Sequence, residues 1–346
     1  EEPKMIVEFG NRCRSVICFR MSPYMKSKVV ETMQENTNKT CLAIGDGAND
    51  VNMIQTANVG IGIIGREGRQ AASNSDFAIT RFRHLKRLLA VHGRLSLIRL
   101  CGVIRYMIYK NIVFCFPHLW YFIFTNWSPA TLFDGWLLAT YNLIWTLFPP
   151  GEYGFFEQDV SFKSMMQYPA IYREARKGKY LTWNRFVLEL VNGLYQSGVL
   201  FYFNYYLPSN SIINPRGYTD SQTTSGLQLF VGIVIVVNMQ TMIRSHHWNV
   251  FLFLGVVVSI LLFFLFGLPY GSFASLVPQM YFVPQTLFTM YMPYLCLLIS
   301  IVACLAPEAI LGYLKGMWFP SSTRIIRESE ILEGGRRSSS LIQASV

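Results

Sequence analysis

Charged side chains are scarce in this sequence: Asp, Glu, Lys and Arg make up 14% of its 346 residues, while hydrophobic residues make up 52%. A soluble globular domain carries about 25% charged residues. The shortage excludes an ordinary soluble protein and predicts that much of the chain lies in lipid. The net charge of +10 would also fit a nucleic-acid-binding protein. Because the basic residues lie mainly between apolar runs, we interpret them as a membrane-topology signal and expect no nucleic-acid partner.

The sequence also lacks any paired cysteine motif. Its seven cysteines include no Cys-x-x-Cys pair and form no cluster with histidine, which excludes a disulfide framework and a structural zinc site. No signal peptide is recognisable. The sequence starts at Glu1 rather than Met, and we therefore expect it to be part of a longer protein.

Residues from 1 to about 80 alternate β-prone runs with helical patterns. We predict strands at 15–19, 40–44, 59–64 and 77–80, and helices at 22–35 and 49–56. Strands that alternate with helices favour a parallel, doubly wound, Rossmann-like α/β sheet. Ligands of such sheets bind beyond the carboxyl ends of the strands, so we expect the chemistry at that edge.

Six apolar runs follow, each close to the roughly 20 residues that an α-helix needs to cross a bilayer. We predict an all-α bundle of six transmembrane spans at about 101–125, 131–150, 186–207, 226–243, 249–268 and 283–307. The loops after the first, third and fifth runs contain one basic residue between them, Arg216, whereas the other loops are richer in Lys and Arg. This alternation predicts a multi-pass integral membrane protein with both ends in the cytoplasm.

Charge and hydropathy divide the chain into three parts. We expect a partial α/β domain at 1–98, a membrane domain at 99–318 and a polar, disordered cytoplasmic tail at 319–346. A basic helical stretch between Phe82 and Arg99 runs into the first span without a turn signal. It would link the first two domains.

The motif with the clearest chemistry is Ile44-Gly45-Asp46-Gly47-Ala48-Asn49-Asp50, at a predicted turn from strand to helix. Its glycines allow a sharp turn and a close approach of the backbone to a ligand. Asp46 lies on the loop and Asp50 follows one helical turn later, so both carboxylates can face one point. Mg²⁺ is usually held by one or two carboxylates together with phosphate and water. We predict that these two aspartates bind Mg²⁺, because an Asp/Gly helix cap explains each residue singly but not the set.

A second strand-to-helix junction, Arg20-Met21-Ser22-Pro23-Tyr24-Met25-Lys26, carries two cations. A helix N-terminus favours anions, and a Lys on the first turn can neutralise a phosphoryl group during transfer. A Lys near a helix start is common and is weak evidence by itself. The run is informative because only one helix and one strand separate it from the Asp46 loop. We predict that Lys26 stabilises a transferred phosphate.

Together, Arg20-x-x-Pro23-x-x-Lys26 and Gly45-Asp46-Gly47-x-Asn49-Asp50 resemble the hinge end of P-type ATPases, which have the haloacid-dehalogenase fold. The resemblance continues through Gly62–Gly68, Gln70–Ala72, Ser75–Ile79, Phe82–Arg83, Leu88–Leu89, Val91–Arg94, Tyr109–Asn111, Phe133–Trp136, Tyr141–Asn142 and Tyr168–Pro169. This series is similar to the phospholipid-transporting (P4, flippase) branch in particular, and it covers residues from about 1 to 310.

The resemblance implies a C-terminal part of an ATP-driven phospholipid translocase that works through an aspartyl-phosphate, with Mg²⁺ and ATP as cofactors. Its site residues would be Asp46 and Asp50 for Mg²⁺, and Arg20, Lys26, Asn49 and Asp50 for ATP and phosphate. The family also implies a two-span accessory glycoprotein subunit and a eukaryotic plasma, Golgi or endosomal membrane. The family's nucleophile lies in Asp-Lys-Thr-Gly-Thr, a run that this sequence does not contain. Because positioning residues cannot replace a carboxylate nucleophile, we expect the chain alone to be inactive.

The transported substrate has its own signal in the first two apolar runs. Their interiors contain no Asp or Glu, but Lys110 is followed by Asn111, and Asn142 lies on the next run. Ionisable residues at membrane depth are costly and often functional, although a long Lys can also reach back to the interface. A positive lining that forms hydrogen bonds suits an anionic phospholipid headgroup, and in the resembling family the Lys and Asn at this position influence lipid handling. We predict that these three residues bind an aminophospholipid-type substrate.

Two other functions stay open on the sequence. A cation pump of the same family would need carboxylates inside the membrane, which the first two runs lack. A non-catalytic membrane scaffold would explain the missing nucleophile. An in-frame Asp-Lys-Thr-Gly-Thr upstream of Glu1 in the transcript would favour the enzyme over the scaffold.

Overall fold

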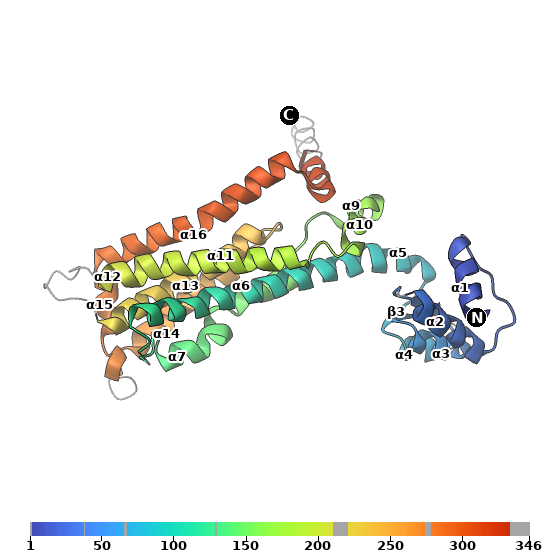
Figure 1. Cartoon of the computed structure of the whole chain (residues 1–346), viewed down its shortest axis with the longest axis horizontal. Helices are drawn as coiled ribbons and strands as arrows, with labels where there is room; N and C mark the ends of the chain where they lie inside the picture. Colours follow the sequence, from blue (N-terminus) through green and yellow to red (C-terminus); the bar gives the residue numbers. More distant parts are fainter. Residues whose placement is uncertain are drawn as a thin grey trace, which may run out of the picture. The chain divides into compact units, whose positions relative to one another are not determined.

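The structure is a computed structural model that describes residues 2–37, 39–65, 68–128, 130–209, 221–273 and 278–332. Contacts within the chain divide it into two compact units, Glu1–His92 and Gly93–Val346. The division falls inside the basic helical stretch that the sequence places between the sheet and the first span. Figure 1 shows the elements of both units.

The first unit contains, within its described residues, a three-stranded parallel sheet with the strand order β1-β2-β3. Its elements are α1 (Glu2–Arg12), α2 (Pro23–Thr37), β1 (Leu42–Gly45), the 3₁₀ turn η1 (Ala48–Asp50), α3 (Val51–Thr56), β2 (Val59–Ile63), α4 (Gln70–Ser73) and β3 (Phe77–Ile79). In the parallel register Ile44 pairs with Ile61, and Gly62 pairs with Ala78. The alternation of strands and helices is confirmed here, whereas the complete haloacid-dehalogenase fold stays a prediction.

Small and aliphatic side chains hold this sheet against its helices. Ile54 of α3, Ile61 of β2 and Ala71 of α4 are buried. α4 lies so close to β2 that a Cβ atom on Gly62 would be 2.5 Å from the Cα atom of Ala72. Only glycine allows this approach, and the packing fixes β2 beside β1, the strand that leads into the candidate site.

The β-prone run at 15–19 is not a strand, and the prediction is wrong there. The run follows α1 without regular secondary structure, and Val16, Ile17 and Phe19 are largely exposed. β-propensity reflects packing on a half-buried sheet more than a preference of the backbone itself. No described strand lies beside this run to pair with it, so its apolar side chains gain nothing from an extended conformation.

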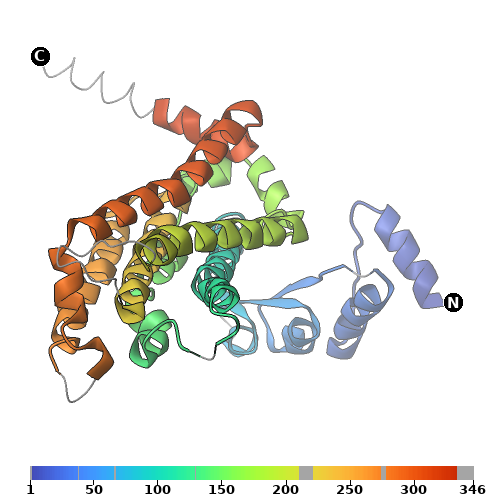
Figure 2. The same cartoon turned by 60° about the vertical axis from the view of Figure 1, so that its left-hand side comes forward.

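The second unit is helical where it is described. The chain reaches it through η2 (Phe82–His84), α5 (Leu85–Arg87) and the π-helical turn η3 (Leu88–Gly93). Its helices and helical turns are α6 (Arg94–Phe124), α7 (Gly135–Thr140), η4 (Tyr141–Trp145), α8 (Phe148–Phe156), α9 (Phe162–Gln167), α10 (Ala170–Arg176), α11 (Trp183–Phe201), η5 (Tyr202–Tyr206), α12 (Leu207–Ser209), α13 (Gln222–Arg244), α14 (Val250–Tyr270), η6 (Pro278–Met280), α15 (Val283–Thr289) and α16 (Tyr291–Trp318). Figures 1 and 2 show α6, α11 and α13 running lengthwise beside one another.

Three helices in the described part of the chain, α13, α14 and α16, are long and apolar enough to cross a membrane. They coincide with the fourth, fifth and sixth apolar runs. α6 and α11 coincide with the first and third runs, but polar and charged residues dilute their apolar character. The chain therefore carries helices suited to a membrane, while the count of six spans and their orientation stay predictions.

The second apolar run, 131–150, is not one continuous helix. α7 ends at Thr140, η4 is a π-helical turn, and α8 begins only at Phe148. Pro149 and Pro150 occupy the first turn of α8. Proline has no N–H group with which to continue a preceding helix, so the two prolines account for the break at Thr146–Leu147.

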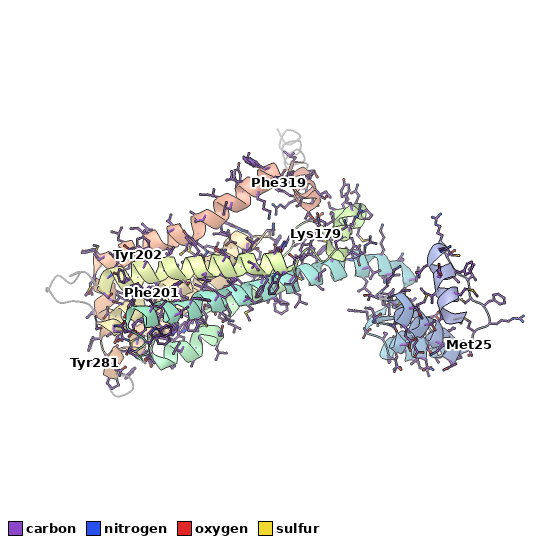
Figure 3. All side chains as sticks on the ribbon, in the orientation of Figure 1. Met25, Lys179, Phe201, Tyr202, Tyr281 and Phe319 are labelled. Atoms are coloured by element: carbon purple, nitrogen blue, oxygen red, sulfur yellow. The ribbon has the colours of Figure 1, made fainter. Side chains whose placement is uncertain are left out.

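Contacts between the loops of the second unit group them at two ends. The segment after α8 meets the α13–α14 loop, where the Glu157 carboxylate accepts a hydrogen bond from Ser245 at 2.7 Å. The segment after α6 instead meets the far ends of α13 and α14, where Gln222 donates to the Thr131 carbonyl at 3.0 Å and Tyr270 donates to Asp134 at 3.1 Å. Figure 3 labels Lys179 and Tyr281 toward these opposite ends. This grouping is compatible with the alternation that the loop charges predict, and the orientation in the membrane stays a prediction.

The tail predicted to be disordered is partly ordered. Residues 322–332 are helical. Glu330 accepts hydrogen bonds from the Ser161 hydroxyl at 2.7 Å and from the Ser161 N–H at 3.2 Å, and Thr323 donates to Glu174 at 3.2 Å. These tertiary contacts, which a polar composition does not reveal, overturn the prediction for this part. Residues 333–346 of the predicted tail lie outside the described residues.

Candidate functional sites

An ion pair at the edge of the small sheet joins two of the predicted site residues. The Lys26 Nζ atom lies 2.8 Å from Asp50 Oδ1. Lys26 is on the first turn of α2, where the Ser22 hydroxyl accepts the N–H of Met25 at 3.3 Å and thereby caps the helix. The helix start therefore directs the lysine toward the beginning of α3.

The position of the Asp50 side chain depends on the absence of a side chain on Gly45, at the end of β1. A Cβ atom on Gly45 would lie 2.9 Å from the Cγ atom of Asp50 and closer still to its Cβ atom, so no side chain fits there. Asp46 follows Gly45 directly and is exposed. The carboxyl end of β1 thus carries one exposed carboxylate and, on the last residue of the 3₁₀ turn η1, a second one in contact with the strand end.

The residue types at this edge fit Mg²⁺. In the described residues no group of three or more His, Cys, Asp or Glu side chains could hold a metal by itself. Mg²⁺ needs fewer protein ligands, because phosphate and water complete its octahedron. Within the described part of the chain, Asp50 Oδ1 pairs with Lys26, while Asp50 Oδ2 and the Asp46 carboxylate form no hydrogen bond. Two carboxylates of this kind match the donor set of a magnesium–phosphate site.

Two other predicted residues lie near this edge in sequence but make no contact with the ion pair. Arg20 is exposed and has a left-handed backbone conformation with φ of 54°. Asn49 is exposed in η1. Neither side chain forms a hydrogen bond or ion pair within the described residues, so both are available to a ligand such as a nucleotide.

Lys110 lies in the middle of α6 and is only 1% exposed. Its Nζ atom donates to the Thr146 hydroxyl at 3.0 Å and to the Thr146 carbonyl at 3.3 Å. Tyr141 of η4 donates to the Lys110 carbonyl at 3.0 Å, and its ring stacks on Phe114 at 4.0 Å. The buried Lys110 ammonium therefore binds at the break between η4 and α8, and it donates there to the neutral hydroxyl and carbonyl oxygens of Thr146.

Asn111 and Asn142 are exposed. Neither forms a hydrogen bond within the described residues, and the structure does not bring them into the contacts of Lys110. Thr146, which does contact the lysine, was missed at the sequence level. The signal that could have found it is the pair Pro149–Pro150, because a helix break exposes backbone carbonyls that a buried cation can use.

A second charge cluster joins three helices beside the middle of α6, where the Arg244 guanidinium lies 4.5 Å from the centre of the Tyr109 ring. Arg244 of α13 pairs with Glu189 of α11 at 2.7 Å and with Glu308 of α16 at 2.9 Å. Asn192 donates to Glu308 at 2.6 Å. Glu189 and Asn192 are polar residues inside the third apolar run, which is a signal for a polar contact there, but their partners are too distant in sequence to infer.

Comparison with known protein families covers most of the chain. Residues 72–321 match the family model described as "Phospholipid-translocating P-type ATPase C-terminal". Phospholipid-transporting ATPase IC of Xenopus tropicalis is 33% identical over 95% of this chain, and phospholipid-transporting ATPase VD of Homo sapiens is 34% identical over 92%. Phospholipid-transporting ATPase C887.12 of Schizosaccharomyces pombe is 33% identical over 93%. The chain spans only 27%, 22% and 26% of the lengths of these three relatives.

Proposed function

This chain belongs to the phospholipid-translocating P-type ATPases, and from that membership we propose that it is the C-terminal part of a machine that moves phospholipids between leaflets at the expense of ATP. The reaction would pass through an aspartyl-phosphate formed on an aspartate outside the printed sequence. The observation that supports this role is the Lys26–Asp50 pair, 2.8 Å apart at the carboxyl end of β1. Without the nucleophile, the chain alone would not hydrolyse ATP.

Each residue at the sheet edge would have a distinct task. Lys26 would place positive charge beside the transferred phosphoryl group, where a fixed cation favours the charge that develops during transfer. Asp46 and Asp50 would hold Mg²⁺, which when bound neutralises phosphate oxygens. Arg20 and Asn49, exposed and unengaged, would contact ATP.

In the helical unit, Lys110 would meet the lipid headgroup. A buried ammonium bound to neutral oxygens can exchange one of them for an anionic phosphate with a gain in charge-assisted hydrogen bonding. Asn111 and Asn142 would add hydrogen bonds from exposed positions. We propose aminophospholipid-type lipids as substrates, both ends of this chain in the cytoplasm, a two-span accessory glycoprotein as partner, and a eukaryotic plasma, Golgi or endosomal membrane as location.

The cation-pump alternative is disfavoured by the pairing of two acids of α11 and α16 with an arginine. Glu189 and Glu308 both face Arg244, which neutralises the oxygens that a transported cation would need. The family comparisons also name phospholipid transport rather than cation transport for the relatives.

Replacing Lys26 with alanine in the full-length protein tests the proposal. We expect lipid-stimulated ATP hydrolysis to fall at least about tenfold, because a single preorganised charge at a reacting group contributes several kcal/mol. Lys28 is the matched control, since it lies on the same helix and forms a surface ion pair with Glu31 at 2.8 Å. Lys28→Ala should leave hydrolysis unchanged. Equal activities of the two variants would contradict the role of Lys26.

A further inference from the structure

The break at Thr146–Leu147 collects polar side chains from other helices. Lys110 of α6 donates to both oxygens of Thr146. Asn238 of α13 donates through Nδ2 to the carbonyl of the preceding residue, Trp145, at 3.0 Å. Two helices therefore send side chains to adjacent carbonyls of the same irregular segment.

A third helix, α14, faces the same segment with Ser259. One turn after Ser259, the Phe263 ring lies 5.5 Å from that of Trp145. One turn before it, a Cβ atom on Gly255 would lie 3.3 Å from the Cγ atom of Glu152 and 3.6 Å from the Cβ atom of Phe148, both on α8. Because residues four apart share one face of a helix, Ser259 points at the stretch between Trp145 and Phe148.

Some polar atoms of these side chains have no hydrogen-bond partner among the described residues. Asn238 Oδ1 and Ser259 Oγ have no hydrogen-bond partner among the described residues, and both residues are 0% exposed. A lysine ammonium has three donors, and Lys110 directs its recorded bonds to Thr146 alone. Buried polar atoms in native proteins are almost always paired, so two acceptors and a donor around one break point to a ligand.

The ligand must both donate and accept hydrogen bonds and must tolerate a neighbouring ammonium group. A metal cation is repelled by Lys110, and an apolar group would leave the oxygens unpaired. Water meets both demands, since a buried water makes about three hydrogen bonds to groups of this kind. We propose that at least one ordered water molecule binds between Asn238, Ser259 and the Thr146–Leu147 break, where it solvates Lys110.

This water site has a consequence that rests on the proposed function. An ammonium solvated by water and by Thr146 is not locked to a carboxylate, so it can turn to a headgroup phosphate when a lipid passes. Asn238 and Ser259 would be positioning residues that act on the substrate through water and Lys110.

A double-mutant cycle in the full-length protein tests the site. If a water links the two side chains, Ser259→Ala should lower the melting temperature by about 1 to 2 °C through loss of a bridged hydrogen bond. Asn238→Leu should lower it further, because it also removes the direct hydrogen bond to the Trp145 carbonyl. The double variant should lose less than the sum, because the second substitution finds the water already gone. A dry site predicts the opposite sign for Ser259→Ala, since removing an unpaired buried hydroxyl is stabilising.

Ser225 provides the matched control. It is a buried serine with an unpaired hydroxyl near the opposite end of α13, so Ser225→Ala should combine additively with Ser259→Ala. Additive behaviour of the Asn238–Ser259 pair, or a rise in melting temperature with Ser259→Ala, would overturn the proposal.

Radiolytic labelling gives a readout independent of stability. Hydroxyl radicals formed from an ordered water should label Trp145, although its side chain is 0% exposed. The label should be lost in Asn238→Leu, while the exposed Trp318 stays labelled as a control. An unlabelled Trp145 in the unsubstituted protein would refute the water site. A labelled Trp145 with normal lipid transport in Lys110→Ala would instead support the water site and overturn only the transport role.

Discussion

Gly45 has no side chain, and Asp50 occupies the space that one would fill. An added Cβ atom would lie 2.9 Å from the Asp50 Cγ atom and 3.0 Å from Oδ2. Gly45→Ala should therefore displace Asp50 from the strand end and weaken its pairing with Lys26. We expect a loss of about 1–3 kcal/mol of unfolding free energy, together with a loss of phosphoenzyme formation in the full-length protein.

Gly47 is the control for this substitution. Its nearest neighbour to an added Cβ atom is 4.0 Å away, and its φ of −114° suits any residue. Gly47→Ala should leave thermal unfolding near that of the unsubstituted protein. If Gly45→Ala and Gly47→Ala unfolded at the same temperature, the close contact between Gly45 and Asp50 would not contribute to stability.

At the residue scale, the sequence predicts the sheet-edge site because its signals are local. Gly45, Asp46 and Asp50 lie within one strand–turn–helix unit, whose glycines mark the turn. Lys26 joins them across one helix and one strand, a spacing that parallel sheets commonly bring to one edge. Thr146 escaped prediction because its contact with Lys110 spans 36 residues and depends on a helix break.

At the scale of elements, a buried ion pair ties the start of α6 to the segment after α8. Two nitrogens of Arg94 donate to the two Asp159 oxygens at 2.9 and 2.5 Å, and Arg94 is 1% exposed. Asp159→Asn keeps the shape but leaves a buried guanidinium without its counterion. We expect a loss of about 3–5 kcal/mol in the stability of the helical unit, measurable by chemical denaturation of the full-length protein.

The exposed Arg324–Glu328 pair, with its atoms 2.8 Å apart, is the control for Asp159→Asn. A surface pair of this kind contributes about 0–1 kcal/mol, so Glu328→Gln should change stability little. A similar small effect of Asp159→Asn would show that Arg94 finds other partners.

Polar residues of α11 bind backbone carbonyls of α16 one turn before a proline. Pro307 lies inside α16 and cannot donate to the Ala303 carbonyl, which instead accepts from Tyr195 of α11 at 3.0 Å. The next residue of α11, Gln196, donates to the adjacent Cys304 carbonyl at 3.1 Å. In a hydropathy pattern, Tyr195 and Gln196 only lower the apolar character of the third run. Their role cannot be inferred from the sequence, because the carbonyls that they bind belong to a helix 108 residues later.

At the scale of the whole helical unit, composition predicts where helices form better than how their ends are joined. α13, α14 and α16 appear where the apolar runs place them. The contacts between Ser161 and Glu330, by contrast, connect residues 169 positions apart and order a segment that composition marks as disordered. Polar contacts between residues far apart in sequence produce no periodic pattern in the sequence, so they could not be predicted from it.

One such contact predicts how stability depends on pH. Glu157, after α8, accepts hydrogen bonds from the Ser245 hydroxyl at 2.7 Å and from the His246 N–H at 3.0 Å, and the His246 ring nitrogen Nδ1 lies 2.9 Å from it. Burial alone would raise the pKa of Glu157, but the hydrogen bonds from His246 and Ser245 outweigh it and leave the pKa below its usual value. A carboxyl with a lowered pKa stabilises the folded state above its unfolded pKa, about 4.3, and loses that contribution as the pH falls through the folded pKa.

Glu157→Gln removes this charge, so the gap in melting temperature between the unsubstituted protein and the variant should be full at pH 6–7. The gap should shrink as the pH falls from about 5 toward 3, because protonation then makes the two proteins alike. Glu328→Gln, at an exposed carboxyl, should show no such narrowing. A Glu157→Gln gap that stayed constant from about pH 7 to pH 3 would mean that the carboxyl is not charged when it joins the two loops, and that they are held by shape alone.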